Sequence, residues 1–452
     1  MIGNAARQRV MRYIYPRIRS IHAHRISNKN VSGCTSAFFV GLALLCLFPE
    51  SLSADNWPQW RGPLGTGVTN ETRLPTRWDA ENHVKWKTVL PERGNSTPAI
   101  WGKRIFLTQA RGAQRLVICL DRADGKVLWE KGTTYDGPET FHPTNTPCAA
   151  SPATDGDVVV ANFGSAGVFA FDFEGEILWQ ADLGTVTHQW GYAASPVLDG
   201  DRCFVHFGPG KNHLIAAFDK RSGRKLWQVN VPLEHPSERT DGFAGKQGEI
   251  GSWSTPILVR TEKRTELIVS LPGRLTAFDP VAGTELWRCD GLNPLLYTSA
   301  MAGDGFVVGS GGYGGSTIAV RPGGSGDVTQ KRLWHKLRDK QRIGSGVIAN
   351  GHLYILNTPG TAQCVDLANG ETVWEQRLSG VGARSESWSS MILAGDLIYV
   401  NNQAGDVFIL KAAPKFELIA TNSISDGIMN ASIAVSDGEL FLRTEKHLWC
   451  IR

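Results

Sequence analysis

Apolar and polar residues alternate in short runs along most of the chain after residue 82, and Asp-Gly or Gly-rich turns separate the runs. Alternation with a period of two predicts β-strands, and Asp-Gly between two such runs predicts a tight hairpin. The 50 glycines and 15 tryptophans of the 452-residue chain fit many short strands joined by turns. The pattern therefore predicts an all-β fold.

A longer repeat is superimposed on this alternation. Its signature is an apolar residue, Asp, a turn containing Gly, and then Leu or Val followed by Trp. The copies are Leu120-Asp121 to Trp129, Phe171-Asp172 to Trp179, Phe218-Asp219 to Trp227, Phe278-Asp279 to Trp287 and Val365-Asp366 to Trp374. Asp opens such a turn and Gly supplies its positive φ, while each Trp buries roughly 150–250 Å². We expect the repeat tryptophans, from Trp86 to Trp374, to hold neighbouring units together.

Each repeat unit begins with a hairpin whose first strand follows Ser or Thr. The starts are Thr97, Ser151, Ser195, Thr255, Ser299, Ser345, Ser390 and Ser432. The last of these eight units holds only three strands, and residues 84–89 supply a strand that has no hairpin before it. With a period of about 46 residues, the sequence predicts a single eight-bladed β-propeller over residues 82–452. We expect four-stranded blades and a ring closed by pairing of the N-terminal strand into the C-terminal blade.

The first 54 residues have the order of a secretory signal peptide. Seven basic residues and no acidic one precede residue 36, an apolar run covers residues 37–48, and small residues follow. The apolar run is short for a membrane span, which takes about 20 residues. An uncleaved anchor is the alternative. We predict export to the periplasm or extracellular space, and a monomeric mature chain without an integral membrane span.

Residues 55–81 do not fit a blade. They are rich in Gly, Pro and Trp. We expect an irregular lead-in that packs on the ring and is not a separate domain.

The formal net charge of +4 would suit an anionic partner. Residues 1–54 hold seven of the 47 Lys and Arg residues and one of the 43 acidic residues, so the remainder carries a net charge of about −2. The basic character therefore belongs to the leader. The sequence gives no reason to expect a nucleic-acid partner.

Six of the eight cysteines lie outside the leader, and none forms a C-x-x-C pair. Several occupy strand positions that Ala fills in other repeats, so we expect small buried residues and no disulfide framework. His142, His188 and Cys148 lie on loops of adjacent blades. Three residues scattered over separate segments are a weak pattern for a metal, so no metal site is predicted.

One face of the predicted propeller is better suited to binding than the other. In an up-and-down blade, the links from second to third strands and from blade to blade share one face, here called the loop face. The opposite, turn face carries short uniform turns. Long loops on a rigid scaffold usually carry binding residues. The candidates on the loop face are His142, Asn145, His188, Trp190, Tyr192, Glu249, Trp253, Arg342, Glu386 and Trp388.

Trp253 and Trp388 occupy the same position, just before an innermost strand, so we expect both near the central channel. In one interpretation they are stacking surfaces for a flat ligand, Arg342 or Arg384 binds an anion, and Glu249 or Glu386 binds a cation. In the other, the aromatic residues plug the channel and the charged groups are solvated. The sequence leaves both interpretations open.

The Phe-Asp…Gly…Leu-Trp units resemble the repeats of the pyrroloquinoline-quinone (PQQ) quinoprotein dehydrogenase-like propeller superfamily over residues 82–452. The segment from Asn56 to Pro63 resembles the start of exported PQQ-binding-like propellers of planctomycete-type bacteria. The resemblance implies the fold. It does not imply one function, because such repeats build both calcium- and PQQ-dependent alcohol dehydrogenases and a non-enzymatic lipoprotein of the outer-membrane barrel assembly machinery.

The dehydrogenases of this superfamily bring a catalytic Asp beside calcium, Glu and Asn calcium ligands, a Trp under the quinone and often an adjacent Cys-Cys disulfide. This sequence has no adjacent cysteines, and Trp253, Trp388, Glu249, Asn145 and Asp241 match no motif of the family residue by residue. No catalytic role is therefore transferred. We expect an exported binding or scaffold protein, with no assured cofactor, that recognises a protein, peptide or polysaccharide of the cell envelope. The alternative is a PQQ- and calcium-dependent dehydrogenase acting on an alcohol or sugar.

Overall fold

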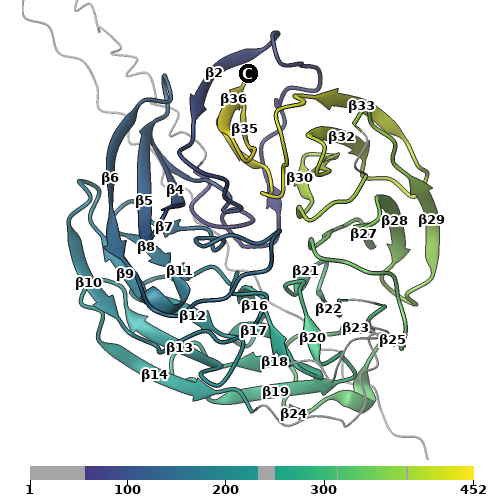
Figure 1. Ribbon diagram of the computed structural model, residues 1–452. Coiled ribbons are helices and arrows are strands. Elements are labelled where there is room, and N and C mark those ends of the chain that lie inside the picture. Colours follow the sequence, from purple (N-terminus) through teal and green to yellow (C-terminus); the bar gives the residue numbers. More distant parts are fainter. Residues whose placement is uncertain (1–55, 233–249, 313, 383–384) are drawn as a thin grey trace, which may run out of the picture. The chain divides into compact units, whose positions relative to one another are not determined.

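The computed structural model describes residues 56–232, 250–312, 314–382 and 385–452, all within the compact unit Leu52–Arg452. These residues form strands and two 3-10 turns, η1 (Gly164–Ala166) and η2 (Thr329–Lys331). Eight sheets of four or five strands follow one another around a ring (Figure 1). The predicted all-β, eight-bladed propeller is confirmed.

The first four blades follow the predicted order along the chain. Blade 1 contains β3 (Ala99–Trp101), β4 (Arg104–Arg111), β5 (Gln114–Asp121) and β6 (Val127–Thr134). Blade 2 contains β7 (Ala153–Thr154), β8 (Val159–Asn162), β9 (Val168–Phe171) and β10 (Ile177–Ala181). Blade 3 contains β11 (Val197–Asp199), β12 (Arg202–Phe207), β13 (Leu214–Asp219) and β14 (Lys225–Asn230). Blade 4 contains β16 (Ile257–Arg260), β17 (Thr265–Leu271), β18 (Arg274–Phe278) and β19 (Glu285–Asp290).

The remaining blades repeat this arrangement. Blade 5 contains β21 (Met301–Gly303), β22 (Phe306–Ser310), β23 (Thr317–Val320) and β25 (Trp334–Lys336). Blade 6 contains β26 (Val347–Ala349), β27 (His352–Asn357), β28 (Thr361–Asp366) and β29 (Thr372–Arg377). Blade 7 contains β30 (Ile392–Ala394), β31 (Leu397–Asn401), β32 (Asp406–Lys411) and β33 (Leu418–Ser423). Blade 8 contains β34 (Ala434–Ser436), β35 (Glu439–Arg443), β36 (His447–Ile451) and β2 (Val84–Val89).

The eighth sheet combines strands from both ends of the described chain. β2 pairs antiparallel with β36, with Lys87 opposite Trp449 and Val89 opposite His447. The sequence predicted this pairing. The fourth strand of blade 8 therefore comes from the segment before blade 1.

Short parallel strands that the sequence pattern did not indicate supplement the blades. β1 (Val68–Thr69) adds to the innermost strand of blade 7, and β24 (Gly326–Asp327) adds to the outermost strand of blade 4. β15 (Gly251–Ser252) pairs with β20 (Leu295–Leu296). Strands of two residues are too short to show alternation, so the sequence carries no periodic signal for them.

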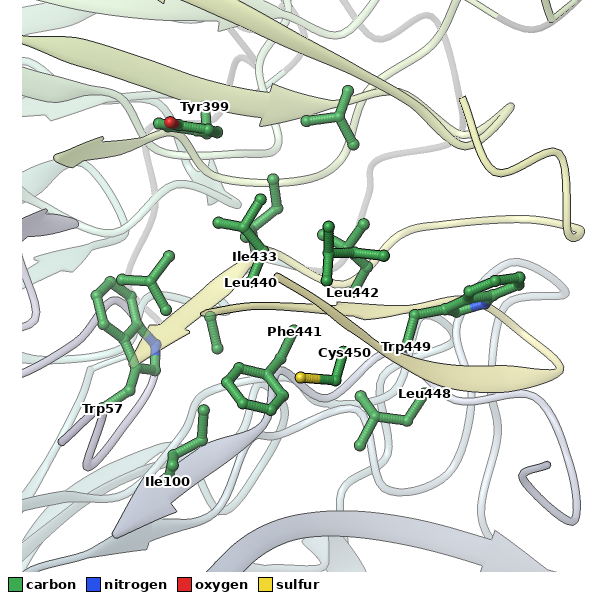
Figure 2. Packing of buried hydrophobic residues seen from close by; sticks show 14 of the residues in the cluster. Trp57, Ile100, Tyr399, Ile433, Leu440, Phe441, Leu442, Leu448, Trp449 and Cys450 are labelled. Carbon is green, nitrogen blue, oxygen red and sulfur yellow. The ribbon is translucent and has the colours of Figure 1, made fainter. Parts of the chain in front are cut away.

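The hydrophobic core is divided among the contacts between neighbouring blades. One cluster joins blades 2 and 3, another blades 4 and 5, and another blades 6 and 7, while the largest surrounds blade 8. Figure 2 shows part of the largest cluster, where Trp57 of the lead-in lies in the same packed region as Ile100, Phe441 and Cys450. Each blade therefore depends on its neighbour for burial of its faces.

The repeat tryptophans dock onto the turn of the next blade. Trp179, only 7% exposed, donates its indole N–H to the carbonyl of Lys220 at 2.7 Å. A Cβ on Gly223 would lie 2.6 Å from the Trp179 ring, so the repeat requires Gly in this turn. The same bond joins Trp86 to Arg122, Trp129 to Phe173, Trp227 to Pro280, Trp334 to Leu367 and Trp374 to Ala413.

Trp287 differs from the other repeat tryptophans. Blade 5 has no Asp…Gly turn in the matching position, and Trp287 donates instead to the Glu266 carboxylate of its own blade at 2.8 Å. Glu266 also accepts from the Arg264 guanidinium at 2.9 Å and from the Gly323 backbone N–H at 3.1 Å. The buried Glu266 carboxylate therefore takes the place of the missing turn as the partner of Trp287. It also holds Gly323, shortly before β24.

The lead-in crosses the turn face of the ring. The Pro58 carbonyl accepts from the Thr154 N–H at 2.7 Å, and the Gln59 side chain accepts from the Leu198 N–H at 3.3 Å. Both bonds fall near the turn-face ends of innermost strands. These bonds attach the segment to blades 2 and 3.

Arg61 ties this segment to the opposite side of the ring. Its side chain is buried and donates to the carbonyls of Thr66, at 2.7 Å, and Gly346, which precedes β26. Burial lowers the pKa of the Arg61 guanidinium to about 9. The lead-in therefore crosses the channel from blades 2 and 3 to blade 6.

Candidate functional site

A cavity of about 320 Å³ lies at the centre of the ring. Its walls combine residues from loops of the loop face with residues that begin the innermost strands, and Trp60 of the lead-in also lines it. Because the lead-in crosses the turn face, Trp60 forms a floor, and the cavity is a blind pocket reached from the loop face. The size is at the lower end of small-molecule pockets, which occupy roughly 300–1,000 Å³.

A chain of hydroxyl groups runs around the cavity. In each of seven consecutive pairs, the backbone N–H of one hairpin-start residue donates to the hydroxyl oxygen of the next, at 2.7–3.0 Å. The chain runs from Thr97 through Ser151, Ser195, Thr255, Ser299, Ser345 and Ser390 to Ser432. These are the eight positions that the sequence marked as hairpin starts. Their hydroxyl groups tie the innermost strands together, which the repeat pattern alone did not reveal.

Ser195→Ala is expected to lower the free energy of unfolding by about 1–3 kcal/mol, because the buried N–H of Ser151 loses its acceptor. Ser195→Thr retains the hydroxyl oxygen and should lose less. Chemical denaturation followed by far-UV circular dichroism measures both. Equal losses in the two variants would contradict the role of the oxygen.

An aromatic wall forms one side of the cavity. Trp253 lies 5.6 Å from Trp190 and 5.3 Å from Tyr297, measured between ring centroids, and these pairs are tilted by 38° and 40°. The Trp253 indole N–H donates to the Gly191 carbonyl at 2.9 Å, which joins the loop before blade 4 to the loop before blade 3. His188 packs edge-on against Trp253, with centroids 4.8 Å apart. The wall is therefore held by contacts between loops of different blades.

Neutral polar side chains complete the mouth of the cavity. The Asn145 amide donates to the carbonyl of Trp190 at 2.8 Å. The Asn95 amide donates to the Thr144 carbonyl at 3.2 Å, and the Asn430 amide to the Asn95 side-chain oxygen at 3.4 Å. These bonds connect loops that precede blades 1, 2, 3 and 8. The mouth is consequently ordered before any ligand binds.

The structure brings five of the ten predicted site residues into the cavity wall. They are His142, Asn145, Trp190, Trp253 and Trp388. His188 and Tyr192 are buried behind the wall. Glu386 is exposed and does not line the cavity, and Glu249 and Arg384 lie outside the described residues.

Arg342 lies away from the cavity wall. Its guanidinium is 2% exposed and forms an ion pair with Asp339 at 2.8 Å. It also donates to Gln363 at 2.9 Å and to Ser310 and Thr317 at 3.2 Å. These partners join blades 5 and 6, so Arg342 lies in the packing between two blades, and its contact with an anion stays a prediction.

Sequence reasoning missed several lining residues. Trp60 lies in a segment that no repeat covers, and Asn95, Asn430 and Tyr297 belong to loops without a shared motif. The only available signal was the concentration of Trp in the lead-in. Their placement depends on how the loops and lead-in fold over the ring.

Cys148 and Tyr192 form a buried pair behind the mouth. The Cys148 N–H donates to the Tyr192 hydroxyl at 3.1 Å. Burial raises the pKa of the Cys148 thiol to about 12 and raises the pKa of Tyr192 well above its usual value. The thiol is therefore protonated at neutral pH and is a poor nucleophile or metal ligand. Within the described ranges, no three His, Cys, Asp or Glu side chains group as metal ligands.

Comparison with known proteins identifies the family. Residues 67–228 and 174–420 match the family model described as outer membrane protein assembly factor BamB. The chain belongs to this family of PQQ-repeat propellers. No curated protein matches the chain.

Solved structures share the architecture. BamB from Moraxella catarrhalis has a TM-score of 0.54 and 14% identity, with 81% of this chain and 98% of that chain covered. A europium-containing methanol dehydrogenase has a TM-score of 0.62 and 11% identity, with 87% and 90% covered. The quinohemoprotein alcohol dehydrogenase from Comamonas testosteroni has a TM-score of 0.62 and 10% identity, with 88% and 80% covered. Identities this low show the shared fold alone.

The lining residues of this BamB-family chain do not fit a calcium-bound quinone. PQQ carries carboxylate groups, and calcium takes six to eight oxygen ligands that usually include carboxylates. Among the described residues, the cavity lining contains no Asp, Glu, Lys or Arg. The side-chain oxygens of Asn95, Asn145 and Asn430 already accept hydrogen bonds. The described part of the pocket therefore offers neither Lys or Arg counter-charges for the quinone nor carboxylates for the metal.

Two buried histidines support the wall from blade 3. The Nε2 atoms of His206 and His213 lie 2.7 Å apart, and Nδ1 of His206 lies 2.6 Å from the Ser254 carbonyl. The carbonyl only accepts, so Nδ1 of His206 carries the proton and Nε2 of His213 donates to Nε2 of His206. Desolvation lowers the pKa of His206 to about 4 and that of His213 well below its usual value. Both rings are therefore neutral in the folded protein.

The histidine pair predicts an acid-sensitive fold. Because both folded pKa values lie below the unfolded value of 6.5, the pair's contribution to stability is complete above pH 6.5 and is lost as the pH falls toward 4. The slope is at most about 1.4 kcal/mol per pH unit for each imidazole. Unfolding measured between pH 7.5 and 4.5, in steps of about half a unit, should show a smaller decline in the double variant His206→Gln/His213→Phe. The same decline in both proteins would contradict the assignment.

Proposed function

We propose that the protein is an exported binding or scaffold protein that holds its ligand or partner at the mouth of the central channel, on the loop face. The observation that carries this proposal is the blind pocket itself, which combines five aromatic side chains with neutral hydrogen-bonding groups. Its floor and walls are held by bonds between blades, so little conformational freedom is lost on binding. Such preorganised concave sites are typical of ligand binding.

Membership in the BamB family is compatible with a non-enzymatic role. Several features of this chain support binding over catalysis. The described wall contains no Asp, Glu, Lys or Arg side chain, and the thiol nearest the mouth is protonated. A periplasmic or extracellular location follows from the leader pattern of residues 1–54. No helix of the described ranges is both long and apolar enough to cross a bilayer.

A PQQ- and calcium-dependent dehydrogenase remains the alternative function, and it is supported by the fold shared with the methanol and alcohol dehydrogenases above. The lining residues argue against it. Adding PQQ with calcium to the purified chain should leave the quinone absorbance and the melting temperature unchanged. Saturable binding together with reduction of a dye by an alcohol would establish the alternative instead.

Trp388→Ala should decrease retention of envelope material on the immobilised protein at least tenfold, because the change removes an aromatic face of the pocket. Trp101→Ala is the matched control, since Trp101 ends an innermost strand at the turn face and does not line the cavity. Retained material is quantified for the wild type and both variants. Equal retention by Trp388→Ala and the wild type would contradict binding at this mouth.

A further inference from the structure

We propose that the pocket takes the end of an uncharged carbohydrate chain. This inference rests on the proposed function and adds the chemical class of the ligand and the way it enters. It draws on three properties of the pocket: its closed floor, its aromatic wall and its uncharged hydrogen-bonding groups.

The closed floor restricts the ligand to a chain end. Trp60 lines the base of the pocket. The neighbouring residues of the lead-in bond to blades 2, 3 and 6, through Pro58, Gln59 and Arg61. Arg61 is buried, and replacing Gly62 with a larger residue would press on Trp57, with a Cβ 2.7 Å from its ring. A polymer therefore cannot pass through the channel, and only a terminal unit reaches the floor.

The aromatic wall suits a saturated ring better than a flat one. Trp190, Trp253 and Tyr297 are in direct contact, with centroids 5.3–5.6 Å apart and planes tilted by 38–54°. No flat ring fits between them. The three side chains form a bent aromatic surface in the pocket wall, against which the C–H face of a sugar can pack. Trp60 and Trp388 add further aromatic surface.

The polar groups of the described wall include no Asp, Glu, Lys or Arg, and most of them can donate. The oxygens of Ser151, Ser195, Thr255 and Ser299 each accept a backbone N–H, which leaves each hydroxyl hydrogen directed elsewhere. Among the described residues, these hydrogens have no protein acceptor, and all four residues line the pocket. Sugar hydroxyl groups accept from such donors and also donate in return.

Other ligand classes fit this chemistry less well. A charged ligand would lose water without gaining a Lys, Arg, Asp or Glu counter-charge from the described wall. A wholly apolar ligand would remove water from the hydroxyl groups and the Asn side chains and leave them without partners. A neutral saccharide satisfies both the aromatic faces and the polar groups.

The test is calorimetric titration of the full mature chain with neutral trisaccharides, namely cellotriose, maltotriose, mannotriose and chitotriose. Trigalacturonate and the deacetylated chitosan trimer are the charged counterparts. We expect at least one neutral trisaccharide to bind at least tenfold more tightly than either charged one. Capping both ends of that trisaccharide with a bulky group should abolish binding, while capping one end should not.

Variants connect this binding to the pocket. Trp388→Ala should weaken binding of the neutral trisaccharide tenfold or more, and Trp388→Phe, which keeps a stacking face, should weaken it less. Trp101→Ala should have no effect. Melting temperatures show whether each variant is folded, and Trp388→Phe keeps the test informative if Trp388→Ala is not.

The inference is overturned if a charged trisaccharide binds as tightly as the neutral ones, or if no trisaccharide binds at millimolar concentration. In either case the proposed function stands as long as Trp388→Ala still decreases the retention of envelope material on the immobilised protein. If Trp388→Ala changes neither saccharide binding nor envelope retention, both the inference and the proposed function fail.

Discussion

Trp179→Ala should lower the free energy of unfolding by about 3–5 kcal/mol, the cost typical of truncating a buried Trp. The substitution empties the space between blades 2 and 3, where the ring stacks on Phe218 with centroids 5.8 Å apart. It also removes the bond to the Lys220 carbonyl. Denaturation followed by far-UV circular dichroism measures the loss without relying on the tryptophan signal.

The neighbouring residue provides the control for this prediction. Leu178 is 45% exposed, and Leu178→Ala should change stability by about 0.5 kcal/mol or less. If Trp179→Ala cost as little as Leu178→Ala, the repeat tryptophans would not be what holds the blades together.

Glu266→Ala should cost about 3–5 kcal/mol, because it leaves buried donors without their shared acceptor. The carboxylate is 0% exposed and serves Arg264, Trp287 and Gly323. Glu266→Gln retains one acceptor oxygen and should lose less. Chemical denaturation of the three proteins gives the differences directly.

An exposed glutamate of the same blade tests whether burial is responsible. Glu285 pairs with Arg288 at 3.1 Å on the surface, and Glu285→Ala should cost about 1 kcal/mol or less. A similar loss for Glu285→Ala and Glu266→Ala would contradict the role assigned to the buried network.

The sequence was sufficient for the fold because each blade repeats the same local chemistry. The Asp…Gly turns and the tryptophan pairs recur at nearly fixed spacing, and the strand from Val84 to Val89 stood out because it had no hairpin of its own. The structure differs from the repeat pattern where one copy lacks the Asp…Gly turn. Trp287 required a tertiary partner, Glu266, that no local pattern identifies.

The site was predictable only where a loop residue had a fixed relation to a repeat. Trp253 and Trp388 precede innermost strands, so their approach to the channel followed from topology. Arg342 also lies in a loop before an innermost strand, but it forms an ion pair with Asp339, three residues away. This ion pair holds Arg342 in the packing between blades. Trp60 reaches the pocket through a segment with no periodicity, so only the three-dimensional structure could place it.

The central claim is that the ligand or partner binds at the mouth of the channel on the loop face. Hydroxyl-radical footprinting of the mature chain, with and without an envelope fraction, tests it most directly. We expect the oxidation of Trp388 and Trp190 to decrease on binding, while that of Trp101 at the turn face and Leu418 on the outer strand of blade 7 is unchanged. Protection of Trp101 or Leu418 with Trp388 still fully oxidised would rule out binding at this mouth.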